Sequence, residues 1–120
     1  PNMTVLTSNI AAALNRTKLS AEDLSLMERY ARDTSPTYCA GCTLACEPTV
    51  GGEVPIGDIL RYLMYYHSYG ECERARALFA ELPATTRARL LSYDYTNAEK
   101  ICPQGVKIGG LIEEATRLLG

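Results

Sequence analysis

The clearest structural signal in this sequence lies in residues 56–67, which read IGDILRYLMYYH. Six side chains recur there at i, i+3, i+4, i+7, i+8 and i+11, the spacing of one helical face: Ile56, Ile59, Leu60, Leu63, Met64 and His67. This spacing predicts an amphipathic helix that ends at Gly70. Similar stripes predict further helices at 8–14, 20–31, 75–82, 87–91 and 108–119.

Capping residues mark where several of these helices begin or end. Ser20 with Asp23 resembles a capping box, and Ser35-Pro36 ends the helix that begins at this box. Thr96 with Glu99 predicts one short capped turn. We found no sustained strand pattern. The sequence therefore predicts an all-α fold, with about five to six short helices.

Residues 37–55 interrupt the helical pattern. They contain three cysteines, Pro48 and Gly51-Gly52, without sustained periodicity. They therefore predict a long cysteine-rich loop, around which the helices are arranged. A loop of this length in a compact domain is usually functional or disordered.

Length and charge exclude several classes of function. The 120 residues carry 12 Lys+Arg and 14 Asp+Glu, a net charge of −2 without a basic block, which argues against a nucleic-acid or anionic-membrane partner. No apolar run approaches the roughly 18 residues of a membrane span, and no secretory signal opens the sequence. We therefore expect a cytoplasmic location, with export as part of a longer protein as the alternative. Because residue 1 is proline, we expect this chain to be a piece of a longer one.

The five cysteines are clustered rather than spread. Three lie within eight residues, and the set is Cys39, Cys42, Cys46, Cys72 and Cys102. A disulfide framework usually joins distant loops through an even number of cysteines, and a chain of this apolar content does not need one. The clustered spacing is instead typical of a loop that folds around something small.

Ferredoxin motifs of the form C-x2-C-x2-C-x3-C-P predict which cysteines act together. In two-cluster proteins the fourth cysteine of each motif binds the other cluster. Counting back from Cys102-Pro103 places the other ligands of a second motif at Ala98, Tyr95 and Ser92, which cannot bind iron as thiolates do. One cluster has therefore lost its ligands, and the other keeps a complete set: Cys39, Cys42, Cys46 and Cys102. The spacing between Cys42 and Cys46 is x3 rather than x2.

Three states of these four cysteines stay open: a [4Fe-4S] cluster, a structural zinc ion, and an empty or disulfide-oxidised remnant. Zinc would bring the four sulfurs to roughly 4 Å from one another, and a cluster would hold them farther apart. Cys72, between Glu71 and Glu73, is predicted to be a free thiol. His67 is predicted to pack or hydrogen-bond, with metal ligation as the alternative if Cys102 lies far from the other cysteines.

The sequence also resembles a known family over nearly its whole length. The resemblance is carried by Asn9-Ile10-Ala11-Ala12-Ala13, Leu19-Ser20-Ala21-Glu22-Asp23, Tyr38-Cys39-Ala40-Gly41-Cys42, Leu60-Arg61-Tyr62-Leu63-Met64-Tyr65, Ser68-Tyr69-Gly70 and Cys102-Pro103-Gln104-Gly105. These motifs are similar to the C-terminal part of ferredoxin-linked aldo/keto reductase family proteins.

The resemblance implies that this chain corresponds to two parts of a longer protein. Residues 1–18 would be the end of a reductase barrel or a linker helix, and residues 19–120 an α-helical, ferredoxin-like domain. NADP and the catalytic residues would belong to the barrel, outside this sequence. The implied function is electron transfer or storage through one [4Fe-4S] cluster, with the barrel and a redox partner as partners. The alternative is a structural module that covers the barrel and binds zinc or no metal.

Overall fold

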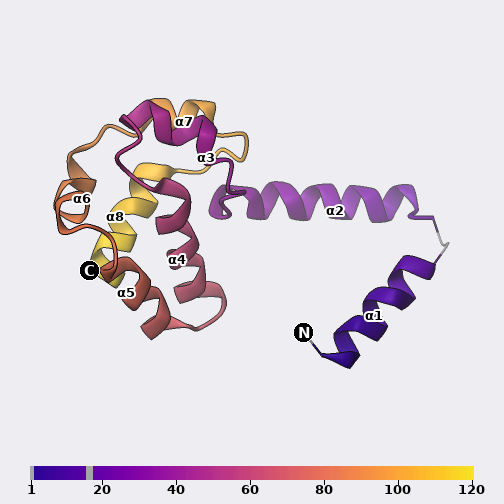
Figure 1. Cartoon of the computed structure of the whole chain (residues 1–120). Helices are drawn as coiled ribbons and strands as arrows, with labels where there is room; N and C mark the ends of the chain where they lie inside the picture. The colour runs from indigo at the N-terminus through magenta and orange to yellow at the C-terminus, as the bar shows by residue number, and fades with distance from the viewer. Residues whose placement is uncertain (1, 16–17) are drawn as a thin grey trace. The chain divides into compact units, whose positions relative to one another are not determined.

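The computed structural model describes residues 2–15 and 18–120 and forms two units, residues 1–31 and 32–120. The described residues form eight α-helices and three short 3-10 helices, without a strand (Figure 1). The predicted all-α class is therefore confirmed, but the predicted number of about five to six helices is too low for the described residues, because short helices such as α3 carry no periodic stripe. The predicted boundary between residues 18 and 19 stays a prediction.

The first unit contains α1 (Met3–Leu14) and most of α2 (Ala21–Thr34). α1 begins five residues before the predicted cap Ser8, because the Asn2 side chain accepts a hydrogen bond from the Val5 amide at 2.9 Å. The capping box before α2 is confirmed: Ser20 N donates to Asp23 Oδ2 at 2.9 Å, and Asp23 N donates to Ser20 Oγ at 3.1 Å. Neither helix has a buried residue.

The second unit contains the other helices. They are α3 (Thr43–Cys46), α4 (Ile56–Ser68), α5 (Cys72–Ala80), α6 (Ala84–Arg89), α7 (Thr96–Ile101) and α8 (Ile108–Leu119), with the 3-10 turns η1 (Ser35–Thr37), η2 (Glu47–Val50) and η3 (Leu90–Ser92). The prediction of a loop over residues 37–55 is wrong in part, because α3 and η2 lie within it. A helix of four residues is too short to show a periodic stripe.

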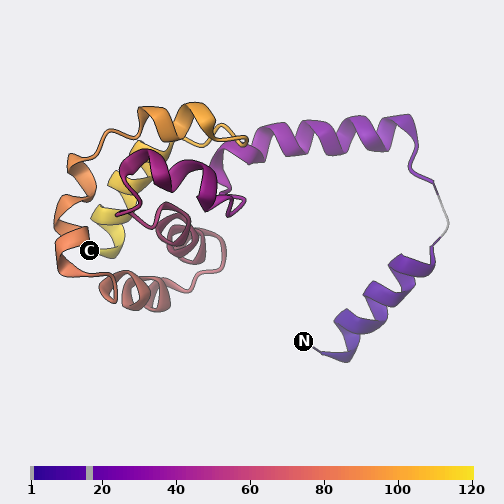
Figure 2. The ribbon, with the colours of Figure 1, turned by 45° about the horizontal axis from the view of Figure 1, so that its top comes forward.

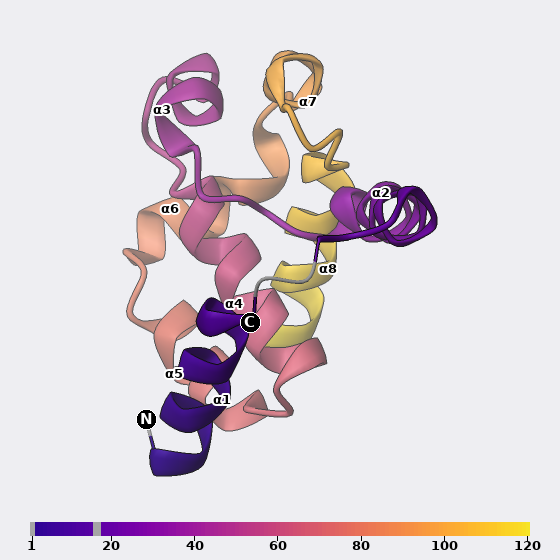
Figure 3. The same ribbon diagram turned by 90° about the vertical axis from the view of Figure 1, so that its right-hand side faces the viewer.

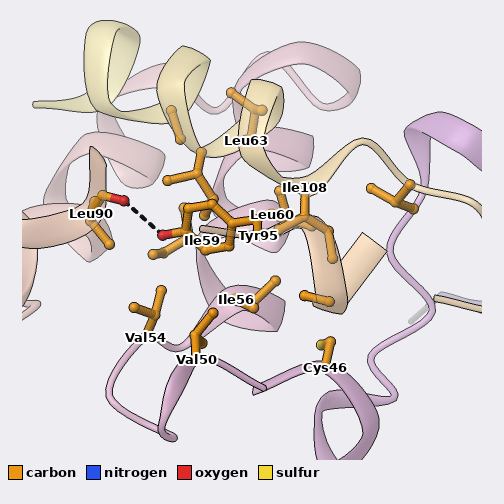
Figure 4. Close-up of a cluster of buried hydrophobic side chains, with 14 of the residues drawn as sticks. Cys46, Val50, Val54, Ile56, Ile59, Leu60, Leu63, Leu90, Tyr95 and Ile108 are labelled. Carbon is orange, nitrogen blue, oxygen red and sulfur yellow. Dashed lines mark hydrogen bonds between the residues drawn. The ribbon is translucent and has the colours of Figure 1, made fainter. Parts of the chain in front are cut away.

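α4 packs against both α5 and α8, and these three helices surround the core of the second unit (Figures 1 and 2). The largest fully buried side chains are Phe79, Ile56, Ile59, Leu90, Ile108, Ile112, Val54 and Val106. Tyr95 is also buried, and its hydroxyl donates a hydrogen bond to the carbonyl oxygen of Leu90 at 2.8 Å (Figure 4). Burial raises the pKa of Tyr95 to about 12, so this hydroxyl stays protonated.

None of the helices in residues 2–15 and 18–120 is both long enough and apolar enough to cross a membrane.

Candidate metal centre

One pocket in the second unit brings together the four cysteines that the motif predicts. Cys39 follows η1, Cys42 precedes α3, Cys46 ends α3, and Cys102 follows α7. α3 and α7 pack side by side, which is why the distant Cys102 reaches the other three (Figure 3). That these four cysteines hold a metal stays a prediction.

The rest of the pocket lining is apolar. The enclosed space of the pocket is small, about 10 Å³, and its other lining residues are Ala40, Ala45, Ile56, Leu60, Pro103, Val106 and Ile108. Among the residues that the structure describes, no carboxylate, imidazole or amide side chain lines it. All five cysteines are free. The available donors are therefore four thiols, the set that binds iron–sulfur clusters or zinc.

The four cysteines differ in burial. Cys46 is buried, Cys39 and Cys102 are half-buried, and Cys42 is exposed. Burial raises the pKa of the Cys46 thiol, and the charges of Glu47, Cys39 and Cys42 raise it further. Four thiolates so placed repel one another, and a bound cation would remove this penalty, because metal binding deprotonates its cysteine ligands.

The four cysteines line one pocket without forming a compact group of ligands in the described part of the chain. Among the described residues, no three His, Cys, Asp or Glu side chains form a group that could hold a single metal ion. The compact arrangement expected around zinc is therefore not preformed in residues 2–15 and 18–120.

The turn between Cys39 and Cys42 depends on Gly41. Gly41 has a φ of +77°, in the left-handed region that side chains other than glycine rarely adopt. This conformation lets the chain turn back on itself between the two cysteines. An alanine at this position would be strained.

Cys72 and His67 do not line the pocket. Cys72 is half-buried at the start of α5, and its Sγ lies 3.9 Å from the carbonyl oxygen of Tyr66. His67 Nε2 lies 3.0 Å from Glu114 Oε1 on α8. His67 therefore makes the hydrogen bond that the sequence predicted, and Cys72 is the free thiol that was expected.

Two glutamates near the pocket were missed by sequence reasoning. Glu47 Oε1 accepts a hydrogen bond from the amide of Gly57 at 3.2 Å, and Glu99 Oε1 accepts one from the amide of Gly109 at 2.9 Å. Each glycine is the second residue of its helix, α4 or α8. The spacing of ten residues from Glu to Gly, present twice, is the sequence signal that could have found them.

The backbone near these two Glu–Gly contacts is also similar. Ile56 N donates to Val54 O at 2.9 Å, and Ile108 N donates to Val106 O at 3.0 Å. The residues between them have nearly equal dihedral angles, φ −78° and ψ 73° at Pro55 against φ −80° and ψ 78° at Lys107. The segments around α3–α4 and α7–α8 are thus two similar halves, 52 residues apart.

The register of the two halves corrects one prediction. It places Cys102 at the position equivalent to Val50, and it places the equivalents of Cys39, Cys42 and Cys46 at Leu91, Asp94 and Ala98. The predicted positions Ser92 and Tyr95 are therefore wrong and Ala98 is right. The cause is the longer spacing of the first motif, which this chain repeats as x2, x3 and x3.

The positions of the second half that are equivalent to Cys39, Cys42 and Cys46 carry no thiol. Val50, Tyr95 and Ala98 are buried in the core. Asp94 Oδ1 accepts a hydrogen bond from the amide of Thr96 at 2.9 Å at the start of α7. The predicted Thr96–Glu99 cap is therefore wrong, because the Thr96 amide at the start of α7 donates to Asp94, and Glu99 accepts instead from the Gly109 amide at the start of α8.

No family model, curated protein or solved structure matches this chain.

Proposed function

We propose that residues 32–120 form an electron-transfer module that holds one [4Fe-4S] cluster through Cys39, Cys42, Cys46 and Cys102. The observation that carries the proposal is the convergence of these four thiols on one pocket whose other walls are apolar. When bound, the cluster would supply one-electron redox chemistry.

The arrangement of the four thiols favours a cluster over a single zinc ion. Among the described residues they do not form the compact group that one ion needs. The enclosed space is only about 10 Å³, so the segments that carry the cysteines would move apart when a cluster binds. The two similar halves also support a cluster, because the fourth thiol comes from the half opposite to the first three, as in two-cluster ferredoxins. These halves are the basis on which we propose a ferredoxin-like relationship.

The chain itself would position and shield the group. Ile56, Leu60 and Val106 would exclude water from the buried side near Cys46. Cys42 is exposed, so the side of the pocket nearest to it is the natural place for an electron to enter and leave. The buried side would tune the potential, since burial and solvent access both affect it.

The wider role is a proposal that rests on the family resemblance alone. The module would serve an aldo/keto reductase-type, NADP-dependent barrel of the same parent protein in the cytoplasm, and it would not catalyse hydride transfer itself. A structural module that covers the barrel is the second candidate. The large apolar side chains exposed on α1 and α2, such as Met3, Ile10 and Met27, favour a covering role for that part of the chain.

Metal and sulfide analysis after anaerobic purification tests the proposal. We expect about four iron and four sulfide per chain, with the visible absorption of a cluster. Cys46→Ser and Cys102→Ser should lose most of the iron, whereas Cys72→Ser, the matched control, should keep it. Stoichiometric zinc without sulfide would reject the cluster and leave the structural candidate.

A further inference from the structure

Arg61, on the second turn of α4, lies against the cysteine turn. Its Nη2 atom is 3.8 Å from the position that a Cβ atom on Gly41 would occupy. Gly41 lies between Cys39 and Cys42, at the exposed side of the pocket. The guanidinium group is therefore next to the part of the site that solvent and a redox partner reach first.

The charge of Arg61 has no ion-pair partner in residues 2–15 and 18–120. Arg74, Arg76 and Arg89 each pair with a glutamate, at 2.7, 3.1 and 2.9 Å. Asp58 lies three residues before Arg61 on the same helix, a spacing that allows a pair, yet the described residues show none between them. The positive charge is instead directed at the turn that carries two of the thiols.

An iron–sulfur centre with four thiolates would give this charge a role. Such a centre is anionic, and reduction adds one more negative charge to it. A nearby cation stabilises the reduced form more than the oxidised form, since net charge and surroundings set the potential. Three other charged groups lie near the turn: Arg74 is paired with Glu71, Glu47 accepts a hydrogen bond from the Gly57 amide, and Asp58 lines the same hollow as Arg61 and Gly41.

We propose that Arg61 sets the reduction potential of the centre by placing a positive charge beside the Cys39–Cys42 turn. The inference deepens the proposed function and depends on it. Arg61 is not a ligand in this proposal. It acts on the cluster through space and leaves the ligand set unchanged.

Redox titration of the reconstituted full chain, with Arg61→Gln, Arg61→Lys and Arg74→Gln beside the wild type, tests this role. Arg61→Gln should make one-electron reduction about three- to tenfold less favourable, a shift of up to about 59 mV toward negative potential. Arg61→Lys should keep a potential close to that of the wild type, because lysine retains the positive charge. Arg74→Gln is the matched control from the same hollow and should leave the potential unchanged. Salt should reduce the shift, because Arg61 is exposed.

The outcomes separate the two proposals. A wild-type chain without iron and sulfide would overturn the proposed function and this inference together. A loaded chain whose potential is the same in the wild type and in Arg61→Gln would overturn only this inference. A shift of equal size in Arg74→Gln would also overturn it, because the effect would then belong to the whole surface. Iron content and circular dichroism of each variant report whether the fold and the ligands persist.

Discussion

Replacing Glu99 should weaken the second unit through the start of α8. Its carboxylate accepts the amide hydrogen of Gly109 at 2.9 Å and is half-buried. The first amides of a helix have no partner within the helix, and a negative charge there is favoured by the helix dipole. Glu99→Ala removes both contributions, whereas Glu99→Gln keeps an oxygen acceptor and removes the charge.

The two variants should therefore lose different amounts of stability. A hydrogen bond to a charged group contributes about 1.5–3 kcal/mol, so we expect Glu99→Ala to lower the free energy of unfolding by about 2 kcal/mol. Loss of the charge alone should cost about 1 kcal/mol or less. For a unit of this size, residues 32–120, each kcal/mol corresponds to roughly 4–8 °C in Tm. The expected decreases are about 8–16 °C for alanine and up to about 8 °C for glutamine.

Near-ultraviolet circular dichroism of the tyrosines follows this unit, because every tyrosine except Tyr30 lies in residues 32–120. Glu113→Gln, an exposed glutamate on α8, is the matched control and should unfold like the wild type. If Glu99→Ala unfolds within a degree or two of the wild type, the carboxylate does not stabilise α8 and the reasoning is refuted.

Two further predictions use the same unit. Gly57→Ala should destabilise the second unit by about 1–3 kcal/mol, because the new Cβ would collide with Thr43 Cγ2. Gly109→Ala meets only ordinary contacts of 3.6–3.8 Å and should change stability by less than about 1 kcal/mol. Equal midpoints of urea unfolding for the two variants would contradict this prediction. The Tyr93 hydroxyl, and then the charge of Arg89, hold the pKa of Glu53 below its ordinary value, so Glu53 stabilises the fold above that value and loses this contribution as pH falls. The difference in Tm between the wild type and Glu53→Gln should therefore shrink below about pH 4.5, and a difference that grows there would refute the assignment.

Long, strongly amphipathic elements could be predicted from the sequence. The stripe from Ile56 to His67 matches α4, because its apolar face packs against α5 and α8. The start of α1 was misplaced, because Ser8 can lie within a helix as well as cap one, and Asn2 is the actual cap. α3 was missed because a single turn of helix has no periodicity.

Some parts of the candidate site could be predicted from the sequence and others could not. The four cysteines could be grouped from motif spacing, since their order along the chain carries that information. The roles of Glu47 and Glu99 were missed, because each contact depends on how one half of the unit folds back on itself, and only the repeated spacing of ten residues from Glu to Gly indicates them in the sequence. The equivalence of Cys102 with Val50 also needed coordinates, because the altered spacing of the first motif hides it.

The origin of the fourth thiol has a consequence for assembly. Cys39, Cys42 and Cys46 are local in sequence and could meet in a largely unfolded chain, but Cys102 arrives only when α7 has docked on α3. A group bound by all four would act as a cross-link that closes a long loop, and it would stabilise the folded state by mass action. Loss of that group would first loosen the docking of α3 on α7, while the packing of α4 on α5 and α8 persists. Cofactor insertion would then be the last step of maturation, and its reversal the first step of decay.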